Sequence, residues 1–154
     1  MERYLKKIRA LTSLGQRLSE LSTCKRLQVG AIIFPVDCTA IYAIGYNGPS
    51  SGLPNDSCNE LAVDNCGCVH AEANAVVKFN DALAKPSILY STRLPCWRCA
   101  ALILNCTNII GVIWEEIYRD DAGHKLLLVG KLNVVKQEDL EKCSAIVEGW
   151  RNAC

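Results

Sequence analysis

Strand-like and helix-like segments alternate along this chain, and this alternation limits the folds that it can adopt. Strand patterns lie at 29–34, 39–44, 87–91, 109–114 and 131–136. Helical patterns lie at 5–21, 70–83, 95–104, 120–128 and 138–151. Alternating elements of this length predict an α/β fold, in which helices cover both faces of a sheet. The glycine- and proline-rich stretch 45–59 is expected to be a loop that is long enough to have a function.

Length and composition narrow the class of protein further. The 154 residues are expected to form a single domain over 1–154, because domains usually contain about 100–200 residues. Hydrophobic residues make up 50% and charged residues 21%, which excludes a disordered chain. The net charge of +1 argues against an extended nucleic-acid interface. Since no secretory signal or membrane-spanning run is visible, we expect a cytoplasmic protein without a membrane partner.

Two short segments contain residues of the kind that bind a catalytic metal. His70, Cys96 and Cys99 offer one imidazole and two thiols, and each segment lies at the start of a predicted helix. Three such ligands suit tetrahedral zinc with one position left open, which is typical of a catalytic site. Glu72 lies two residues after His70 and is not needed as a ligand, so it is expected to transfer protons.

The combination of these segments, His-x-Glu and Pro-Cys-x-x-Cys, is the signature of zinc-dependent nucleobase deaminases. In that chemistry, water activated by zinc attacks the ring carbon that carries the exocyclic amine, and ammonia leaves. A redox-active Cys-x-x-Cys pair is the alternative for Cys96 and Cys99 taken alone, and a surface or core histidine is the alternative for His70.

Beyond these motifs, the chain resembles the deoxycytidylate deaminases of the cytidine deaminase superfamily over nearly its whole length. The segments that carry the resemblance are 22–31 (STCKRLQVGA), 45–49 (GYNGP), 67–72 (GCVHAE) and 116–120 (EIYRD). The resemblance implies a three-layer α-β-α fold with a mixed five-stranded sheet. It also implies zinc-dependent hydrolysis of dCMP to dUMP and ammonia, which would supply dUMP for thymidylate synthesis.

The resemblance also implies roles for individual residues. His70, Cys96 and Cys99 would bind zinc and Glu72 would transfer the proton. The residues expected to contact the substrate are Asn47 at the deoxyribose, Tyr118 near the pyrimidine, Arg26, Arg119 and Ser22 at the phosphate, and Ala71. Other interpretations remain open: solvated surface arginines, a half-buried core tyrosine, and an asparagine that forms the Asn-Gly turn.

Regulation and assembly are implied only by the resemblance. Many dCMP deaminases of this kind are hexamers that dCTP activates and dTTP inhibits. The effector would bind near the loop at 45–49, with Tyr46, Asn47 and Gly48 as the candidate contacts. We therefore expect a homo-oligomer, with a hexamer favoured.

The chain contains ten cysteines, which is unusual for a protein of a reducing compartment, where clustered thiols more often bind metal than form disulfides. Cys24, Cys58, Cys66 and Cys68 lie in or beside the long loop, and the resemblance includes members with a second, structural zinc near this loop. These four residues could instead be small buried hydrophobic residues. The remaining Cys38, Cys106, Cys143 and Cys154 show no ligand spacing and are interpreted as packing or surface thiols.

Arg93 departs from the family pattern, because it stands just before Leu94-Pro95 where relatives often carry a more neutral stretch. We expect it to affect the base substituent that is accepted or the handling of the phosphate. Two other functions remain as alternatives. A nucleic-acid editing deaminase acting on tRNA or single-stranded DNA should need a basic, aromatic-lined groove, and aromatic residues make up only 6% here. A non-catalytic zinc-binding scaffold would not need Glu72.

Overall fold

The computed structural model describes residues 1–62, 66–117 and 119–153 of the chain. The helices are α1 (Glu2–Ser19), α2 (Ala71–Val76), α3 (Trp97–Leu104), α4 (Ala122–Val129) and α5 (Ser144–Asn152), with short 3-10 turns η1 (Asp81–Leu83) and η2 (Gln137–Asp139). The strands are β1 (Gly30–Pro35), β2 (Ala43–Tyr46), β3 (Gly48–Pro49), β4 (Cys68–Val69), β5 (Ser87–Arg93), β6 (Ile109–Glu116) and β7 (Asn133–Lys136). Among the described residues, no helix is long and apolar enough to cross a membrane.

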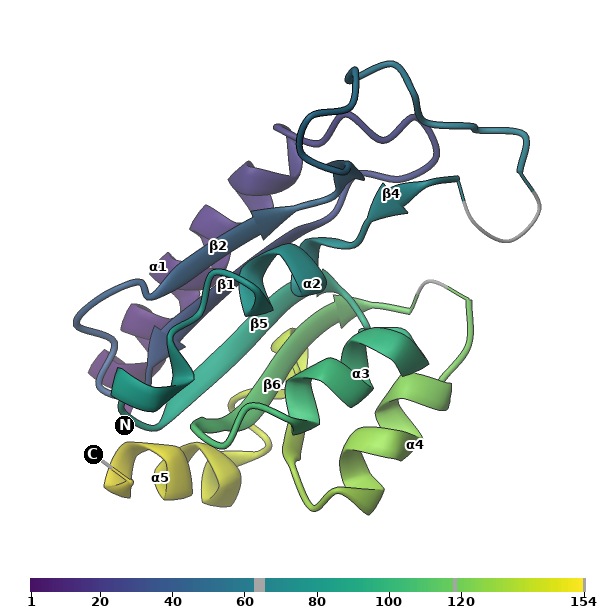
Figure 1. The fold of residues 1–154 in the computed structure, drawn as a ribbon. Coiled ribbons are helices and arrows are strands. Elements are labelled where there is room, and N and C mark those ends of the chain that lie inside the picture. Colours follow the sequence, from purple (N-terminus) through teal and green to yellow (C-terminus); the bar gives the residue numbers. More distant parts are fainter. Residues whose placement is uncertain (63–65, 118, 154) are drawn as a thin grey trace.

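One mixed sheet of five strands forms the centre of the molecule, in the order β2-β1-β5-β6-β7 (Figure 1). β1 runs antiparallel to both β2 and β5, whereas β5, β6 and β7 run parallel to one another. The expected mixed five-stranded sheet is therefore confirmed. Because parallel strands end at the same edge of a sheet, the carboxyl ends of β5 and β6 lie side by side there.

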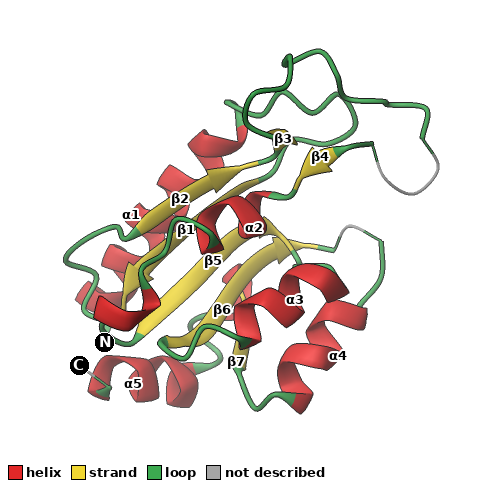
Figure 2. Cartoon of the chain, in the orientation of Figure 1, coloured by secondary structure: helices red, strands yellow, loops and turns green. Residues whose placement is uncertain are grey.

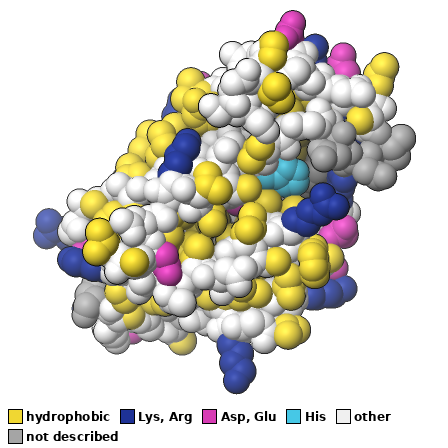
Figure 3. All heavy atoms as spheres, in the orientation of Figure 1, with side chains coloured by type: hydrophobic (Ala, Val, Ile, Leu, Met, Phe, Trp, Pro, Cys, Tyr) yellow, Lys and Arg dark blue, Asp and Glu magenta, His cyan; other side chains and the backbone are white. Residues whose placement is uncertain are grey.

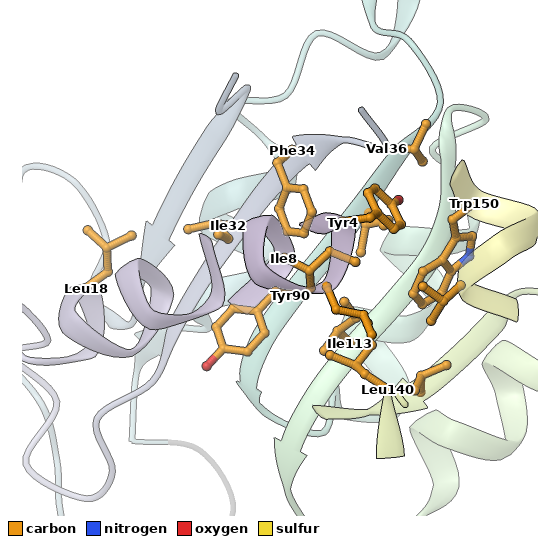
Figure 4. Close-up of a cluster of buried hydrophobic side chains, with 14 residues drawn as sticks. Tyr4, Ile8, Leu18, Ile32, Phe34, Val36, Tyr90, Ile113, Leu140 and Trp150 are labelled. Atoms are coloured by element: carbon orange, nitrogen blue, oxygen red, sulfur yellow. The ribbon is translucent and has the colours of Figure 1, made fainter. Parts of the chain in front are cut away.

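Helices cover both faces of this sheet, as Figure 2 shows. α1 and α5 pack on one face, where Ile32 and Phe34 of β1 share a core with Ile8 of α1 and Trp150 of α5 (Figure 4). α2, α3 and α4 pack on the other face, where β1 contributes Ala31 and Ile33. Alternate residues of β1 thus point into different cores, as the period of a strand requires. The three-layer α-β-α fold is confirmed.

The first helix buries a slightly different face from the one expected. The leucines that recur every three to four residues in the helical pattern at 5–21 include Leu14 and Leu21 and predict that both face the core, but both are exposed. Leu14 lies about 120° around the helix from the fully buried Ile8, and Leu21 follows the end of α1. Thr12 instead faces the sheet and is completely buried.

Three element boundaries differ from those expected by four residues or more, each for a local reason. The second strand begins at Ala43 rather than at 39, because the Asp37 carboxylate accepts the N–H of Thr39 and forms a turn there. α2 ends at Val76 rather than at 83, since Phe79 turns inward to stack on the ring of Tyr42. The last helix begins at 144 rather than at 138, after η2 has brought the side chain of residue 140 into the core.

A short antiparallel pair of strands, called the β3–β4 hairpin below, was not predicted. β3 and β4 contain two residues each and pair antiparallel, with Gly48 opposite Val69 and Pro49 opposite Cys68. Two residues are too few to show a strand period in the sequence. The hairpin leads directly into α2 and so brings the end of the long loop to the start of that helix (Figure 1).

Candidate active site

His70 and Cys96 each occupy the N-cap position of a helix on the same face of the sheet. His70 precedes α2 and Cys96 precedes α3, and both have extended backbone angles. The start of α2 lies directly against β2, because a Cβ at Gly45 would come within 2.1 Å of the Ala71 carbonyl oxygen. Only glycine permits this approach, so the Gly45 position fixes where His70 lies.

The three expected zinc ligands converge. His70 Nδ1 lies 3.5 Å from Cys96 Sγ and 3.5 Å from Cys99 Sγ, and all the candidate ligand atoms lie within 4.8 Å of one another. Zinc bonds of about 2.0–2.1 Å to nitrogen and about 2.3 Å to sulfur place tetrahedral ligand atoms about 3.6 Å (N···S) and about 3.8 Å (S···S) apart. The donor set and its spacing therefore fit a zinc ion, and three protein ligands leave one tetrahedral position for another ligand.

Electrostatic interactions within this group favour the thiolate that a metal requires. Hydrogen bonds from the Cys99 thiol and from His70 lower the pKa of Cys96 to about 3. The hydrogen bond to Cys96 raises the pKa of His70, whereas the interaction with Cys96, followed by burial, raises the pKa of Cys99. The lowered pKa of Cys96 favours the thiolate, which is the metal-binding form of cysteine.

Glu72 lies beside these ligands, in the first turn of α2. Its side chain is buried, with 4% of the residue exposed, and burial raises the pKa of its carboxyl group. The Cys99 thiol donates a hydrogen bond to Glu72 Oε2 at 3.7 Å. A carboxyl group that binds a proton more tightly than usual, next to a site for an activated water, suits general acid–base chemistry.

A pocket opens over Glu72 and is lined by most of the residues expected to contact the substrate. Its space amounts to about 580 Å³, a volume that includes the solvent at its open mouth. The expected residues on its wall are Arg26, Asn47, Ala71 and Arg119. Figure 3 shows a histidine in a hollow of this face, with basic side chains next to it.

Asn47 and Ser22 are joined in a buried network rather than pointing only at the pocket. The Ser22 hydroxyl donates to Asn47 Oδ1 at 2.7 Å, and Asn47 Oδ1 also accepts the N–H of Val29 at 2.8 Å. Asn47 Nδ2 donates to the carbonyl oxygen of Leu27 at 2.7 Å. A side-chain amide has two N–H groups, and within the described part of the chain the second one has no partner, so it can donate to a ligand. Ser22 is buried and does not line the pocket.

The residues expected at the phosphate and the base are placed as follows. Arg26 lines the pocket and donates through Nη1 to the carbonyl oxygen of Ala62 at 2.9 Å, which ties it to the long loop. Arg119 is exposed and lies on the rim of the pocket. Tyr118, expected near the pyrimidine, lies outside the described residues.

The candidate effector residues do not share one surface. Tyr46 is exposed outside the pocket, with Lys78 Nζ 6.0 Å from the centre of its ring. Asn47 lines the pocket, and Gly48 is buried in β3, where a Cβ would come within 2.8 Å of Thr23 Oγ1. Successive residues of an extended chain point to opposite sides, which separates Tyr46 from Asn47.

The other four loop cysteines form a second cluster. Cys24 Sγ lies 3.8 Å from Cys58 Sγ and 3.8 Å from Cys66 Sγ, and Cys68 completes a group whose sulfur atoms all lie within 4.8 Å. These contacts are not disulfides. They match the S···S spacing of about 3.8 Å that tetrahedral zinc requires. Gly67 adopts a φ of +83°, which lets the chain turn between Cys66 and Cys68.

Thiol pKa values in this second cluster diverge. Burial alone would raise the pKa of Cys66, but hydrogen bonds from Cys68 and the neighbouring thiols lower it to about 7. Burial raises the pKa values of Cys24 and Cys68. Outside both clusters, Cys38, Cys106 and Cys143 are half-buried and pack against apolar side chains, whereas Cys154 lies outside the described residues.

The sequence also left part of the pocket unassigned. Leu27, Val29 and Leu94 supply its apolar wall, and their only sequence signal was their nearness to motif residues. Arg93 lines the pocket and forms an ion pair with Glu116 at the ends of the adjacent strands β5 and β6. The pairing could not be read from the sequence, because it depends on the register between two parallel strands.

The sequence and fold match known deaminases. Residues 5–115 match the family described as "Cytidine and deoxycytidylate deaminase zinc-binding region". The chain belongs to this family. Human deoxycytidylate deaminase is 31% identical over 129 residues, which cover 78% of this chain and 72% of the human protein. Zinc is thus the metal that suits this deaminase, and its Cys/His groups are positioned to hold a metal ion.

Solved structures of deaminases resemble this one over most of its length. The dCMP deaminase of cyanophage S-TIM5, crystallised in complex with dCMP and dUMP, is 30% identical, with a TM-score of 0.72. The match covers 83% of this chain and 94% of the phage protein. A structure from a study of A-to-I editing by tRNA:A34 deaminases has a TM-score of 0.52 at 17% identity, over 81% of this chain and 98% of the other. That second likeness shows the fold alone.

Proposed function

We propose that this deaminase hydrolyses dCMP to dUMP and ammonia, and so supplies dUMP for thymidylate synthesis. The observation that carries the proposal is the convergence of His70, Cys96 and Cys99 beside the buried Glu72, in a pocket with arginines on its wall. The named human relative and the phage enzyme crystallised with dCMP and dUMP support the choice of substrate.

His70, Cys96 and Cys99 would hold the catalytic zinc through one imidazole nitrogen and two thiolates. When bound, zinc lowers the pKa of water to about 7 and so supplies a nucleophile at neutral pH. The extended backbone at the two N-cap residues and the packing of α2 and α3 on the sheet support this role, because they would hold the three side chains close together.

Glu72 would move the protons. Its carboxylate accepts a proton from the attacking water, donates it to the ring nitrogen N3, and then passes the second proton of that water to the departing amine. Water contributes the oxygen of the new carbonyl group, and ammonia takes the amine nitrogen, so the atoms balance. The raised pKa of Glu72 favours this role, because the group must hold the proton between the two transfers.

The remaining contacts would position the nucleotide. The free N–H of the Asn47 amide would reach the deoxyribose, and the backbone of Ala71 would contact the pyrimidine, which Tyr118 would also approach. Arg26 and Arg119 would bind the phosphate, since the planar guanidinium group can contact two oxygens at once. Ser22 would act indirectly, by holding Asn47 through the hydrogen bond from its hydroxyl.

The second cysteine cluster would bind a structural zinc. Four thiols at tetrahedral spacing, three of them buried, form a complete ligand set with no position left for water. Metal analysis of the purified protein tests this directly. Two zinc ions per chain support the second site, whereas one zinc ion per chain contradicts it.

Assembly, regulation and location extend the proposal. Exposed apolar side chains on α3 and α4 support a homo-oligomer, and a hexamer is proposed: Trp97, Leu102, Leu128 and Val129. dCTP would activate the enzyme and dTTP would inhibit it, with the effector near the loop at 45–49, whose Tyr46, Asn47 and Gly48 face different sides. The nine described cysteines form no disulfide, which suits the reducing cytoplasm.

A substrate panel tests the proposed activity. Cytidine, deoxycytidine, dCMP, dCTP, 5-substituted dCMPs and a single-stranded oligonucleotide would be offered to the zinc-loaded protein, with and without dCTP as effector. We expect the highest kcat/KM for dCMP. Faster deamination of the oligonucleotide would support an editing enzyme instead, and the absence of any ammonia release would support a non-catalytic scaffold.

A further inference from the structure

The second cysteine cluster borders the pocket as well as the long loop. Three of its four members, Cys24, Cys66 and Cys68, lie in the pocket wall, whereas Cys58 is not among the described residues of that wall. Asn47, which is expected to contact the deoxyribose, lies in the same wall. The cluster is therefore close enough to the substrate site to affect binding there, in addition to stabilising the loop.

Hydrogen bonds through Ser22 join one member of the cluster to Asn47. The Cys24 N–H donates to Ser22 Oγ at 3.2 Å, and the Ser22 hydroxyl donates in turn to Asn47 Oδ1 at 2.7 Å. Ser22 is 7% exposed and Asn47 is 6% exposed, so these bonds are shielded from water. Buried hydrogen bonds are costly to break, because the groups left behind lose their partners. A displacement of Cys24 should therefore change the orientation of the Asn47 amide.

A second member of the cluster reaches the same stretch of chain through the β3–β4 hairpin. Cys68 lies in β4 and pairs with Pro49 of β3, two residues after Asn47. The residue before Cys24 contacts this stretch too, because a Cβ at Gly48 would come within 2.8 Å of Thr23 Oγ1. Two segments thus contact the chain at or next to Asn47, and each of them contains a cysteine of the cluster.

We infer that the second cysteine cluster also controls nucleotide binding, because it positions the Asn47 amide through Ser22. This inference rests on the proposed function and adds a role in substrate binding to the proposed structural zinc site. The four thiols, when a metal joins them, hold Cys24 in place, and Cys24 holds Ser22. Ser22 is a positioning residue, since it is not among the described residues of the pocket wall. Loss of metal from the cluster weakens nucleotide binding and leaves the chemical step intact.

The test is a double-mutant cycle on dUMP binding, measured by calorimetry together with the zinc content of each variant. Cys58→Ser removes one ligand of the cluster without altering the described pocket wall, and Ser22→Ala removes the hydroxyl. We expect each single variant to weaken dUMP binding about fivefold, and to act on KM for dCMP rather than on kcat. The double variant should fall well short of the roughly 25-fold weakening that independent effects would give.

Ser87→Ala is the matched control, because Ser87 is completely buried and its hydroxyl donates to the Lys85 carbonyl oxygen at 2.6 Å. It is not among the described residues of the pocket wall, so its replacement should leave dUMP binding unchanged. Unchanged dUMP binding in Ser22→Ala, or effects of Ser22→Ala and Cys58→Ser that multiply in full, would overturn the inference. A single zinc ion per chain in the wild type would also overturn it. Failure of the wild type to deaminate dCMP would overturn the proposed function instead.

Discussion

The two clusters of possible metal ligands have similar spacings between their atoms, but different kinds of secondary structure hold them in position. His70, Cys96 and Cys99 lie at the starts of α2 and α3, whose inner residues Ala71 and Ala100 are completely buried against the sheet. The cluster of Cys24, Cys58, Cys66 and Cys68 joins three segments that have almost no regular structure. The first cluster is held by the fold, whereas the second must itself hold the segments around it.

Apolar side chains near the second cluster support this distinction. Leu53 and Leu61 of the long loop are 56% and 89% exposed, so they do not anchor it in the core. Metal binding at the four cysteines would then contribute directly to the stability of the loop, as it does in small zinc domains. Loss of metal should therefore abolish chemistry at one cluster and weaken local structure at the other.

Removal of a ligand from the first cluster should have the largest effect on activity. In Cys99→Ala we expect dCMP turnover to fall by more than about 10⁴-fold, because the activated water is lost. The melting temperature should change little, since α3 stays packed on the sheet. Metal analysis and calorimetry of the variant measure both. Cys106→Ala, half-buried and outside both clusters, is the control, and activity retained in Cys99→Ala would contradict the ligand assignment.

Replacement of the acid–base group should separate chemistry from metal binding. In Glu72→Gln we expect turnover to fall by about 10³–10⁴-fold, because no carboxylate can accept the proton of water. The amide has nearly the same shape, so the zinc content should equal that of the wild type. Turnover and zinc are measured on the same preparation. A loss of zinc would show that Glu72 supports the metal rather than the proton transfer.

Disruption of the second cluster should lower the stability of the protein while turnover at saturation changes little. In Cys58→Ser we expect one zinc fewer per chain and a melting temperature lower by about 5 °C, because the loop loses its cross-link. KM for dCMP should rise severalfold, since Arg26 binds the carbonyl oxygen of Ala62 in that loop. Turnover at saturation should change little. Cys106→Ser is the control and should match the wild type in zinc content and melting temperature. If Cys58→Ser also matches the wild type in both, Cys58 is a buried thiol and not a metal ligand.

The smallest effect on stability is expected at a contact without thiols, which joins η1 to the loop between α3 and β6. The Asp81 carboxylate accepts the N–H groups of Thr107 at 2.9 Å and Asn108 at 2.8 Å. Asp81→Asn should lower the free energy of unfolding by about 1 kcal/mol, to the same extent with and without a chelator. Urea unfolding measures this, and sensitivity to the chelator would contradict it.

The same carboxylate gives a pH dependence with a definite sign. Burial alone would raise the pKa of Asp81, but the hydrogen bonds from Asn108 and Thr107 hold it below its ordinary value of 3.8. A folded-state pKa below the unfolded one means that the unfolded chain binds more protons in this range. The stabilisation from Asp81 is therefore present above pH 3.8 and is lost as the pH falls through the folded pKa. The difference between wild type and Asp81→Asn should shrink accordingly.

The catalytic cluster could be anticipated from the sequence because its information is local. His70 and Glu72 lie in one helical turn, as do Cys96 and Cys99, so only the approach of two helix starts had to be inferred. The alternation of strand and helix patterns along the chain likewise predicted helices on both faces of the sheet, and each face of β1 does meet its own core. The sequence also suggested the four loop cysteines as a group, although they are far apart in the chain.

Other features depend on contacts between distant segments and have no local signal. The Arg93–Glu116 pair follows from the register of β5 and β6, which are joined through α3. The buried network of Asn47 depends on Val29 meeting its side chain, although the Asn-Gly pair suggested only a turn. Boundaries were wrong where a side chain such as Phe79 found a tertiary partner that ended a helical pattern.

The β3–β4 hairpin places Cys68 and His70 on either side of a single residue, Val69, which pairs with Gly48. One member of each cluster thus lies on the same three-residue stretch. Insertions at the exposed tip of the loop, such as residues 51–57, should be tolerated, because neither cluster would have to move. An insertion or deletion between 68 and 70 would shift one cluster out of alignment with the other. Variation in loop length among relatives should therefore be large at 51–57 and absent at this stretch.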